Sequence, residues 1–309
     1  MLSSSKKQHP TCLSLDTYYN KYYLPDKNKR IRPTTRNYYC YLYNNRIRPY
    51  FGDMIMKEIT PLHVREWQNS QISLNFKPKY LRILHHFLSG IFDYCVCYHD
   101  LAENPCARVE PIGRHVSSRK TSVWQLDEYE RVFNCMSTTH HRAALALLYW
   151  TGIRKGELYG LQWRDYCPKT KRLRVERNYQ RLNGEAIILP PKTDTSNRTI
   201  ILPNQAYRPL DDHAAECRYA TESNFIFTWS KRKLEEEIWQ ACKQAGVQRI
   251  RIHDLRHSHA SLLIHLNIDV AAISKRLGHS SISMTLNTYA HAYNNADQLI
   301  ADTLNTIGG

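Results

Sequence analysis

The stretch "HHRAALALLYWTGIRKGEL" (140–158) gives the clearest structural signal in this chain of 309 residues. Its first part, "HHRAALALLYWTG", is apolar on most sides, which predicts a buried helix that Gly152 ends. The sequence "IRKGELYGLQWRDY" then begins another helix, and "TSVWQLDEYERVFNCM" before it predicts a capped amphipathic helix. We therefore expect a domain that starts near Ser122 and surrounds the buried helix.

C-terminal to this stretch the hydrophobic period changes from helical to extended. The segments "RLRVERNYQ", "EAIILP" and "TIILP" are rich in β-branched residues, which favour strands. Asn183-Gly184 predicts a hairpin turn between the first two strands, and "KTDTSNR" predicts a loop between the second and third. Helical patterns resume from Lys231 to the end. The domain is therefore expected to be mixed α/β with a small antiparallel sheet.

Towards the N-terminus, residues 12–107 predict a domain made of helices. "TTRNYYCYLYNNRIRPYFG" (34–52) has helical spacing and is expected to end at Pro49 and Gly52. "ITPLHVREWQNSQI" begins with Thr60 as N-cap and Pro61 at the first helical position. "KPKYLRILHHFLSGIFDYCVCYHD" predicts a longer helix, which "ENPC" ends, with one apolar face: Leu81, Leu84, Phe87, Leu88, Ile91 and Phe92. The fold class is α+β, mainly helical.

Charge and composition restrict the class of partner. The net charge is +15, and residues 1–120 carry 19 Lys and Arg against 9 Asp and Glu. Such an excess favours binding to a polyanion, with the N-terminal third contacting phosphates. No apolar run is long enough to span a bilayer, and the N-terminus lacks the apolar core of a secretory signal. Cysteines occur without a disulfide framework, so we expect free thiols and a cytoplasmic protein with no membrane partner.

Four short segments carry residues suited to chemistry: "TGIRKGEL" (151–158), "PKTDTSNRT" (191–199), "HDLRHSHAS" (253–261) and "LGHSSISMTLNTYAH" (277–291). Each has an ordinary explanation by itself, such as a surface arginine, a solvated turn lysine or a histidine cap. His253 and His257 stand four residues apart, a spacing that can bind zinc. They lack the glutamate of H-E-x-x-H, and Arg256 would place a positive charge beside the metal.

Taken together, the four segments suit the handling of a phosphodiester. Arginines bind phosphate oxygens with two parallel hydrogen bonds and neutralise charge in the transition state. Histidine transfers protons near neutral pH, and a lysine can protonate a leaving alkoxide. A tyrosine phenolate can attack phosphorus and form a covalent phosphoester, which conserves the energy of the broken bond. Resealing then needs neither ATP nor a metal, so we expect no cofactor.

These segments resemble the pattern of the tyrosine recombinases, also called phage-type integrases: T-G-x-R-x-G-E-L, a lysine on a β-hairpin, H-x-L-R-H, and L-G-H followed by T-x-x-Y. The resemblance implies that Arg154 and Arg256 clamp the phosphate and that Glu157 holds the helix turn that carries Arg154. It implies that Lys192 is the general acid and His253 the acid/base histidine. His279 would hydrogen-bond a phosphate oxygen. Tyr289, ten residues after that histidine, would be the nucleophile.

The residue patterns and the resemblance together predict a domain organisation. Residues 1–11 form a short extension, 12–107 a core DNA-binding domain, 108–121 a basic linker, 122–292 the catalytic domain and 293–309 a tail helix. With so short an extension, the chain is either a two-domain recombinase or lacks an arm-binding module. The family often has glycine where this chain has Asn267, a residue type that tolerates the left-handed conformation.

The implied reaction is integration or excision of a phage or mobile element in the bacterial cytosol. Two domains would enclose double-stranded DNA at specific sites, and four protomers would exchange strands, with accessory DNA-bending or directionality factors as further partners. The tail would dock on its own domain or on a neighbouring protomer through Leu299, Ile300 and Leu304. Alternatives are a type IB topoisomerase or telomere resolvase, an inactive DNA-binding regulator on the same scaffold, and a zinc hydrolase.

Overall fold

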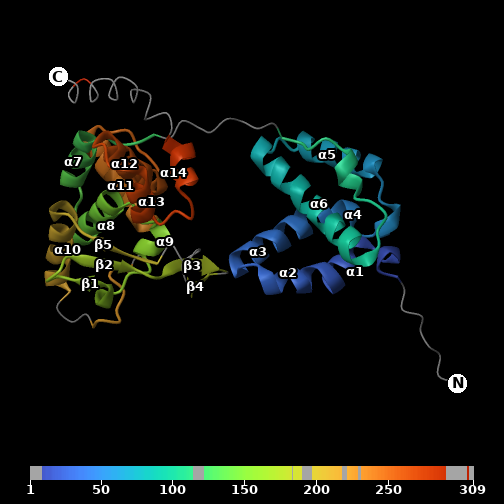
Figure 1. Ribbon diagram of the computed structural model, residues 1–309, viewed down its shortest axis with the longest axis horizontal. Coiled ribbons are helices and arrows are strands. Elements are labelled where there is room, and N and C mark those ends of the chain that lie inside the picture. The colour runs from blue at the N-terminus through green and yellow to red at the C-terminus, as the bar shows by residue number, and fades with distance from the viewer. Residues whose placement is uncertain are drawn as a thin grey trace. The chain divides into compact units, whose positions relative to one another are not determined.

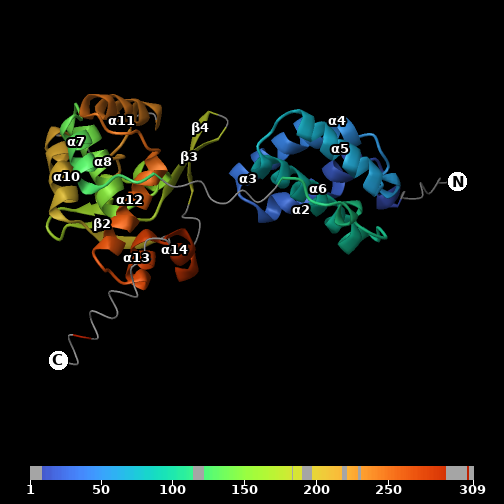
Figure 2. The ribbon, with the colours of Figure 1, turned by 90° about the horizontal axis from the view of Figure 1, so that it is seen from above.

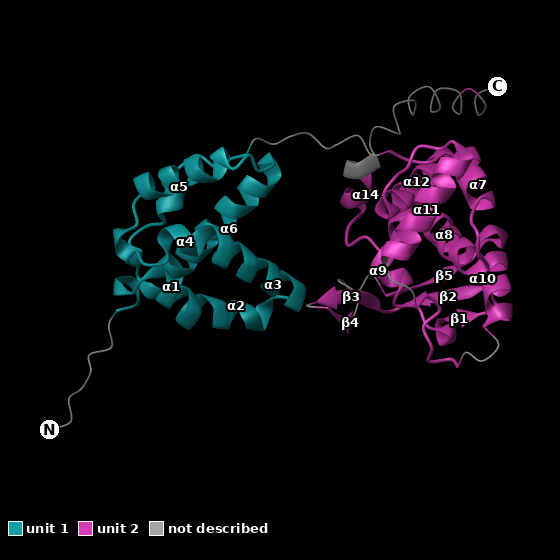
Figure 3. Cartoon of the chain, turned by 180° about the vertical axis from the view of Figure 1, so that it is seen from behind, with its two compact units in different colours: residues 1–119 teal, residues 120–309 magenta. Residues whose placement is uncertain are grey.

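The computed structural model describes residues 9–113, 122–182, 184–189, 197–217, 221–228 and 231–289, together with Asn305. For residues 231 and 287–289 it describes the backbone alone. The chain divides into two compact units, Met1–Arg119 and Lys120–Gly309 (Figure 3). No helix in the described ranges is both long and apolar enough to cross a membrane.

The described part of the first unit is built from helices joined by short loops (Figure 1). The predicted capped helix is α5, with the Thr60 hydroxyl accepting a hydrogen bond from the backbone N–H of His63. The predicted long helix is α6, and its whole predicted apolar face is buried. The helices are α1 (Leu15–Tyr18), α2 (Leu24–Arg30), α3 (Pro33–Leu42), α4 (Arg48–Phe51), α5 (Pro61–Ser73) and α6 (Pro78–His99), with short turns η1 (Pro10–Cys12), η4 (Met56–Glu58) and η5 (Pro105–Arg108).

The prediction that Pro49 ends the third helix is wrong. The chain stays helical from Pro33 to Phe51 because α3 passes through a wide π-type turn, η3 (Tyr43–Ile47), into α4. A second π-type turn, η2 (Tyr19–Tyr23), precedes Pro25 in the same way. Proline lacks an N–H and its ring clashes with the carbonyl four residues earlier in a regular helix. The wider turn before each proline relieves that clash, so the helix continues.

The second unit places helix α8 (Thr139–Thr151) between α10 (Asn204–Glu216) and α12 (Ile252–His265), as Figures 1 and 2 show. Most of the α8 side chains are buried, and the helix ends at Gly152, as predicted. The other helical elements are α7 (Leu126–Asn134), α9 (Lys155–Leu158), η6 (Trp163–Asp165), α11 (Lys231–Ala245), α13 (Val270–Leu277) and α14 (Ile282–Tyr289). Helix α10 was not predicted: it contains Pro209, yet it buries Ala206, Leu210 and His213.

The strands form two antiparallel sheets within the described residues. β1 (Tyr166–Cys167), β2 (Arg172–Val175) and β5 (Arg198–Ile201) form one sheet in that order, and β3 (Asn178–Leu182) and β4 (Glu185–Leu189) form a hairpin that projects from it (Figure 2). The single strand expected for "RLRVERNYQ" is therefore wrong, because the chain leaves the sheet at Glu176–Arg177. There the guanidinium of Arg177 binds the buried carboxylate of Asp165.

Candidate active site

Arg154 lies where α8 ends and α9 begins. Gly152 takes the left-handed conformation, with φ 65°, and closes α8. Arg154 then caps α9: its backbone N–H donates to Glu157 Oε2 at 2.9 Å, and its Nη1 donates to Glu157 Oε1 at 2.7 Å. Glu157 is only 2% exposed. Glu157 therefore contacts the helix turn that it was predicted to hold.

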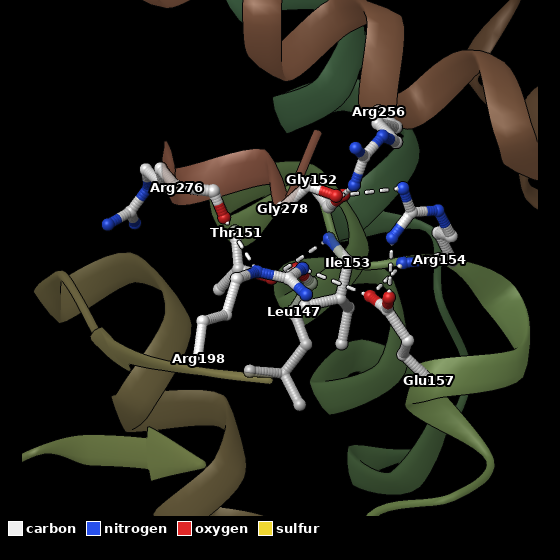
Figure 4. A network of polar contacts seen from close by, with 10 residues as sticks. All are labelled: Leu147, Thr151, Gly152, Ile153, Arg154, Glu157, Arg198, Arg256, Arg276 and Gly278. Atoms are coloured by element: carbon white, nitrogen blue, oxygen red, sulfur yellow. Dashed lines mark hydrogen bonds and ion pairs between the residues drawn. The ribbon is translucent and has the colours of Figure 1, made fainter. Parts of the chain in front are cut away.

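Arg256 comes from the first turns of α12 and is 4% exposed. Its Nη1 donates to the carbonyl oxygen of Gly152 at 2.7 Å. Arg154 in turn donates from Nη2 to the carbonyl oxygen of Gly278 at 3.1 Å, at the end of α13. Each arginine is thus anchored to the C-terminal carbonyl of a helix other than its own (Figure 4). This cross-bracing brings together two segments that are far apart in the sequence.

Both glycines are required by backbone geometry. Gly278 has φ 67°, and Gly152 has φ 65°, a region that residues with a side chain rarely adopt. A Cβ atom at Gly152 would also lie 2.6 Å from Leu277 Cδ2 and 2.9 Å from His259 Cδ2. The helix ends therefore meet closely enough for the arginines to reach both carbonyls.

His279 follows Gly278 directly and continues the same turn. Its backbone N–H donates to Ser274 at 3.0 Å, and its Nδ1 lies 2.7 Å from the hydroxyl of Thr285, which is buried in α14. Burial lowers the pKa of His279 to about 4, and the positive charges of Arg256 and Arg154 act in the same direction. The imidazole is therefore neutral at pH 7 and lies within the field of both arginines.

His253 and His257 lie on one face of α12, with ring centroids 5.3 Å apart in an edge-to-face arrangement. His253 is exposed overall, yet the atoms around its ring lower its pKa by desolvation, with Arg256 as the next cause. Burial lowers the pKa of His257 to about 4. In the described part of the chain no three His, Cys, Asp or Glu residues gather in a group that could hold a metal.

The structure describes the two remaining predicted residues, Lys192 and Tyr289, only in part or not at all. Lys192 lies outside the described residues, in the gap at 190–196. Tyr289 is the last residue of α14, and its side chain is not described. The structure therefore brings together Arg154, Arg256 and His279 with His253 nearby, and positions the backbone of the helix that carries Tyr289.

Two further arginines were not predicted. Arg198, on β5, donates to Glu157 and to the carbonyl of Arg276, and its side chain is 7% exposed. Arg276, on α13, donates to the carbonyl of Trp150 at 3.1 Å and to His259 Nε2 at 3.2 Å. A signal for Arg198 did exist, because alternate residues of a strand share a face and Arg198 shares its face with the buried Ile200.

Comparison with known proteins places this geometry in a family. Residues 123–296 match the model described as "Phage integrase family", and residues 14–72 match "Phage integrase, N-terminal SAM-like domain". The ICEBs1 integrase of Bacillus subtilis is 27% identical over 289 residues, covering 88% of this chain and 78% of that protein. The integrase of Mycobacterium phage L5 is 25% identical over 313 residues, covering 98% and 82%.

Solved structures show the same fold. The Tn1549 transposon integrase in complex with a circular intermediate DNA superposes with a TM-score of 0.76 at 18% identity, covering 94% of this chain and 99% of that one. A lambda integrase dimer bound to a COC′ core site gives 0.64 at 22% identity, covering 88% and 97%. The family match spans more than half of the chain and includes every predicted site residue. This chain belongs to the phage integrase family and is a tyrosine-type site-specific DNA recombinase.

Proposed function

We propose that this recombinase integrates or excises a mobile genetic element, and that it does so through a 3′-phosphotyrosine intermediate at Tyr289. The cross-bracing of Arg154 and Arg256 is the observation that carries this proposal. Guanidinium groups that are fixed to the protein on one side, as the buried Arg256 and the partly exposed Arg154 are, are preorganised for an anion on the other side. A DNA phosphate is the anion that the family membership indicates.

In the first step the phenolic oxygen of Tyr289 attacks the scissile phosphorus, and the bond from phosphorus to the 5′-oxygen breaks. The phenol transfers its proton to His253, which is neutral at pH 7 and can accept it. Lys192 gives a proton to the departing 5′-oxygen. Arg154 and Arg256 neutralise the charge that builds on the non-bridging oxygens.

His279 contributes a hydrogen bond rather than a proton. Its Nδ1 is engaged by Thr285 at 2.7 Å, and its low pKa keeps the ring neutral. The other ring nitrogen, Nε2, then donates to a phosphate oxygen. In the second step a 5′-hydroxyl of the partner duplex attacks the phosphotyrosine and releases Tyr289. The number of phosphodiester bonds is unchanged, so the cycle consumes no nucleotide.

We further propose double-stranded DNA at paired recombination sites as the substrate, held by both units of the chain. The relatives solved with circular intermediate DNA and with a core site support this, as does the excess of positive charge in residues 1–120. Four protomers would act on two sites, with accessory DNA-bending or directionality factors deciding between integration and excision.

A covalent-capture experiment tests the proposal. The protein is incubated with nicked duplexes tiled across the DNA that flanks its own coding sequence, and denaturing gels detect protein linked to DNA. Because of the nick, cleavage releases a short fragment that carries the 5′-hydroxyl. Once that fragment has diffused away the strand cannot be resealed, so the covalent intermediate accumulates. The wild-type protein should give the linked band and Tyr289→Phe should not. A band of equal intensity with Tyr289→Phe would overturn the assignment of the nucleophile.

A second assay separates recombination from simple relaxation. A supercoiled plasmid carries two copies of the captured site, and products are resolved after incubation with the wild-type protein. A recombinase yields deletion or inversion products that Tyr289→Phe does not yield. A topoisomerase-like enzyme would only relax the plasmid, and that result would contradict integration or excision as the function.

A further inference from the structure

We propose that Arg198 is a positioning residue of this active site, which fixes Arg154 and the turn carrying His279 relative to each other. The inference rests on the proposed function, since it assigns Arg198 a part in the cleavage chemistry at Tyr289. Arg198 itself would not touch the DNA, because only 7% of its side chain is exposed.

The first part of the evidence is the pair of acceptors that Arg198 holds. Its Nη2 donates to Glu157 Oε2 at 3.0 Å, and its Nε donates to the carbonyl oxygen of Arg276 at 2.7 Å (Figure 4). One planar guanidinium therefore joins strand β5 to the first turn of α9 and to the last turn of α13. Such a fork has fixed geometry, so it sets a spacing as well as making two contacts.

The second part is that these contacts close a ring. Glu157 binds Arg154, and Arg154 donates to the carbonyl of Gly278 at 3.1 Å. Arg198 also binds Glu157 and donates to the carbonyl of Arg276, two residues before Gly278 in the same helix end. The hydrogen bonds thus lead from Arg154 through Glu157 and Arg198 to the end of α13. The bond from Arg154 to the Gly278 carbonyl of that same helix end closes the ring. A closed ring fixes relative position more strictly than either bond alone.

The third part of the evidence is that the ring holds the last turn of α13, which His279 follows. The last carbonyls of a helix lack partners inside the helix, so donors from outside decide how the final turn is held. Arg198 supplies one such donor to α13, and His279 follows that turn with its N–H bonded to Ser274. A shift of this turn moves the histidine and the Gly278 carbonyl, and Arg154 moves with the carbonyl.

Electrostatics shows that Arg198 and Glu157 act as a pair. Burial would raise the pKa of Glu157, but Arg198 first and Arg154 next outweigh it, so the pKa is lowered and the carboxylate is charged. Removing Arg198 would leave this buried carboxylate with Arg154 as its remaining ion-pair partner among the described contacts. The pull on Arg154 would then be unbalanced, which shifts a phosphate-binding group from its position.

The experiment compares Arg198→Gln and Arg198→Lys in the full chain, with Arg174→Gln as a matched control. Arg174 lies on neighbouring β2, opposite Thr199 of β5, and its ion pairs lie outside the ring, with its side chain 49% exposed. The readouts are the saturating cleavage rate on the nicked duplex that the wild-type protein cleaves, the dissociation constant for that duplex, and the melting temperature.

We expect Arg198→Gln to lower the saturating cleavage rate about 100-fold, as a misplacement near 1 Å does, with DNA affinity within about threefold of wild type. Arg198→Lys keeps the charge and one contact, so it should recover about tenfold of that loss. Arg174→Gln should cleave at the wild-type rate.

Cleavage by Arg198→Gln at the wild-type rate would overturn the inference. So would a cleavage rate of Arg198→Lys as low as that of Arg198→Gln. An equal loss of cleavage rate and DNA affinity would overturn it too, because Arg198 would then be a general structural residue. If the wild-type protein itself shows no Tyr289-dependent cleavage, the proposed function fails, and the inference fails with it for that separate reason.

Discussion

At the residue scale, Arg154 and Arg256 each combine an internal contact with a predicted external one. A guanidinium carries five N–H donors, so an arginine that gives one or two to the protein keeps others for a phosphate. Arg256 gives Nη1 to the Gly152 carbonyl, and Arg154 gives Nη1 and Nη2 to Glu157 and Gly278. The contacts to the protein fix the direction in which each fork points. A lysine has no such rigid fork, so charge alone does not replace these residues.

Arg256→Lys should therefore lower the saturating cleavage rate by about 100- to 1000-fold, the usual cost of losing one oriented donor to the transition state. DNA affinity should change by less than about tenfold, because the charge remains. Arg251→Lys is the matched control, since Arg251 caps the same helix and pairs with Asp254 but its side chain is 66% exposed. Single-turnover kinetics measure both variants. Cleavage by Arg256→Lys at the rate of the control would refute the need for a fork.

Gly152→Ala tests whether the close packing between the ends of α8 and α13 contributes to stability. The new methyl group would lie 2.6 Å from Leu277 Cδ2 in a backbone with φ 65°. Strain and clash together should lower the free energy of unfolding by about 2–4 kcal/mol. Gly246→Ala is the control, because Gly246 has φ 64° but no atom within 4 Å of an added Cβ. Its cost should be about 1 kcal/mol. Urea unfolding measures both, and equal losses would show that packing at Gly152 contributes nothing.

At the scale of helices and strands, the sequence predicted correctly those features that depend on neighbouring residues alone. The N-terminal cap of α5 and the buried face of α6 follow from neighbouring residues. So do the end of α8 at Gly152 and the left-handed φ of 56° at Asn267. The errors occur where a wider helical turn or a distant contact overrides the local pattern. Pro49 and Pro209 lie inside helices, which a local rule forbids. The split between β2 and β3 depends on Arg177 meeting Asp165 from another segment.

The candidate site divides in the same way. Arg154, Arg256 and His279 stand in short motifs whose spacing already favours a phosphate site, and the structure brings them together. Arg198 lies inside one of the four segments, "PKTDTSNRT", but its role could not be predicted, because its partners Glu157 and Arg276 are reached only through the tertiary fold. Alternation along β5 places it on the buried face, yet a charged residue next to a polar loop suggests solvent exposure instead.

The contact between α12 and α13 should make stability depend on pH. His259 of α12 is buried and accepts a hydrogen bond from Arg276 of α13 at 3.2 Å. Burial first, and then Arg276 and Arg256, lower its pKa to about 3. Unfolded, a histidine has a pKa of about 6.5, so below that pH the unfolded chain binds a proton that the folded chain does not. Stability from this group is therefore complete above pH 6.5 and is lost as the pH falls towards 3.

The expected loss is at most about 1.4 kcal/mol per pH unit in this window. His259→Gln keeps an acceptor for Arg276 but does not titrate, so its free energy of unfolding should depend less steeply on pH between 6.5 and 4.5. His265→Gln is the control, because His265 ends the same helix and is exposed. Urea unfolding at several pH values gives the slopes. A slope for His259→Gln equal to that of wild type would contradict the assignment.

At the scale of the whole molecule, each unit has its own core, and the predicted site and most of the net positive charge lie in different units. The buried apolar residues form separate clusters in the two units, and the described clusters share no member. The predicted site lies in the second unit, whereas residues 1–120 carry 19 Lys and Arg against 9 Asp and Glu. Residues 1–120 thus hold +10 of the net charge of +15, and most of the excess positive charge lies outside the unit that holds the predicted site, so we expect truncation to separate much of the attraction for DNA from the site.

A fragment of residues 120–309 should fold with its own cooperative transition, because the cores of that unit lie inside it. It should bind the cleavable duplex about 100-fold more weakly than the full chain at low salt, since fewer phosphates are neutralised. For the same reason the plot of log affinity against log salt concentration should be shallower, as each lost phosphate contact reduces the slope by about 0.9. Fluorescence anisotropy at several salt concentrations measures both quantities, with circular dichroism confirming that the fragment is folded. A folded fragment with the salt slope of the full chain would show that residues 1–119 contact no phosphates.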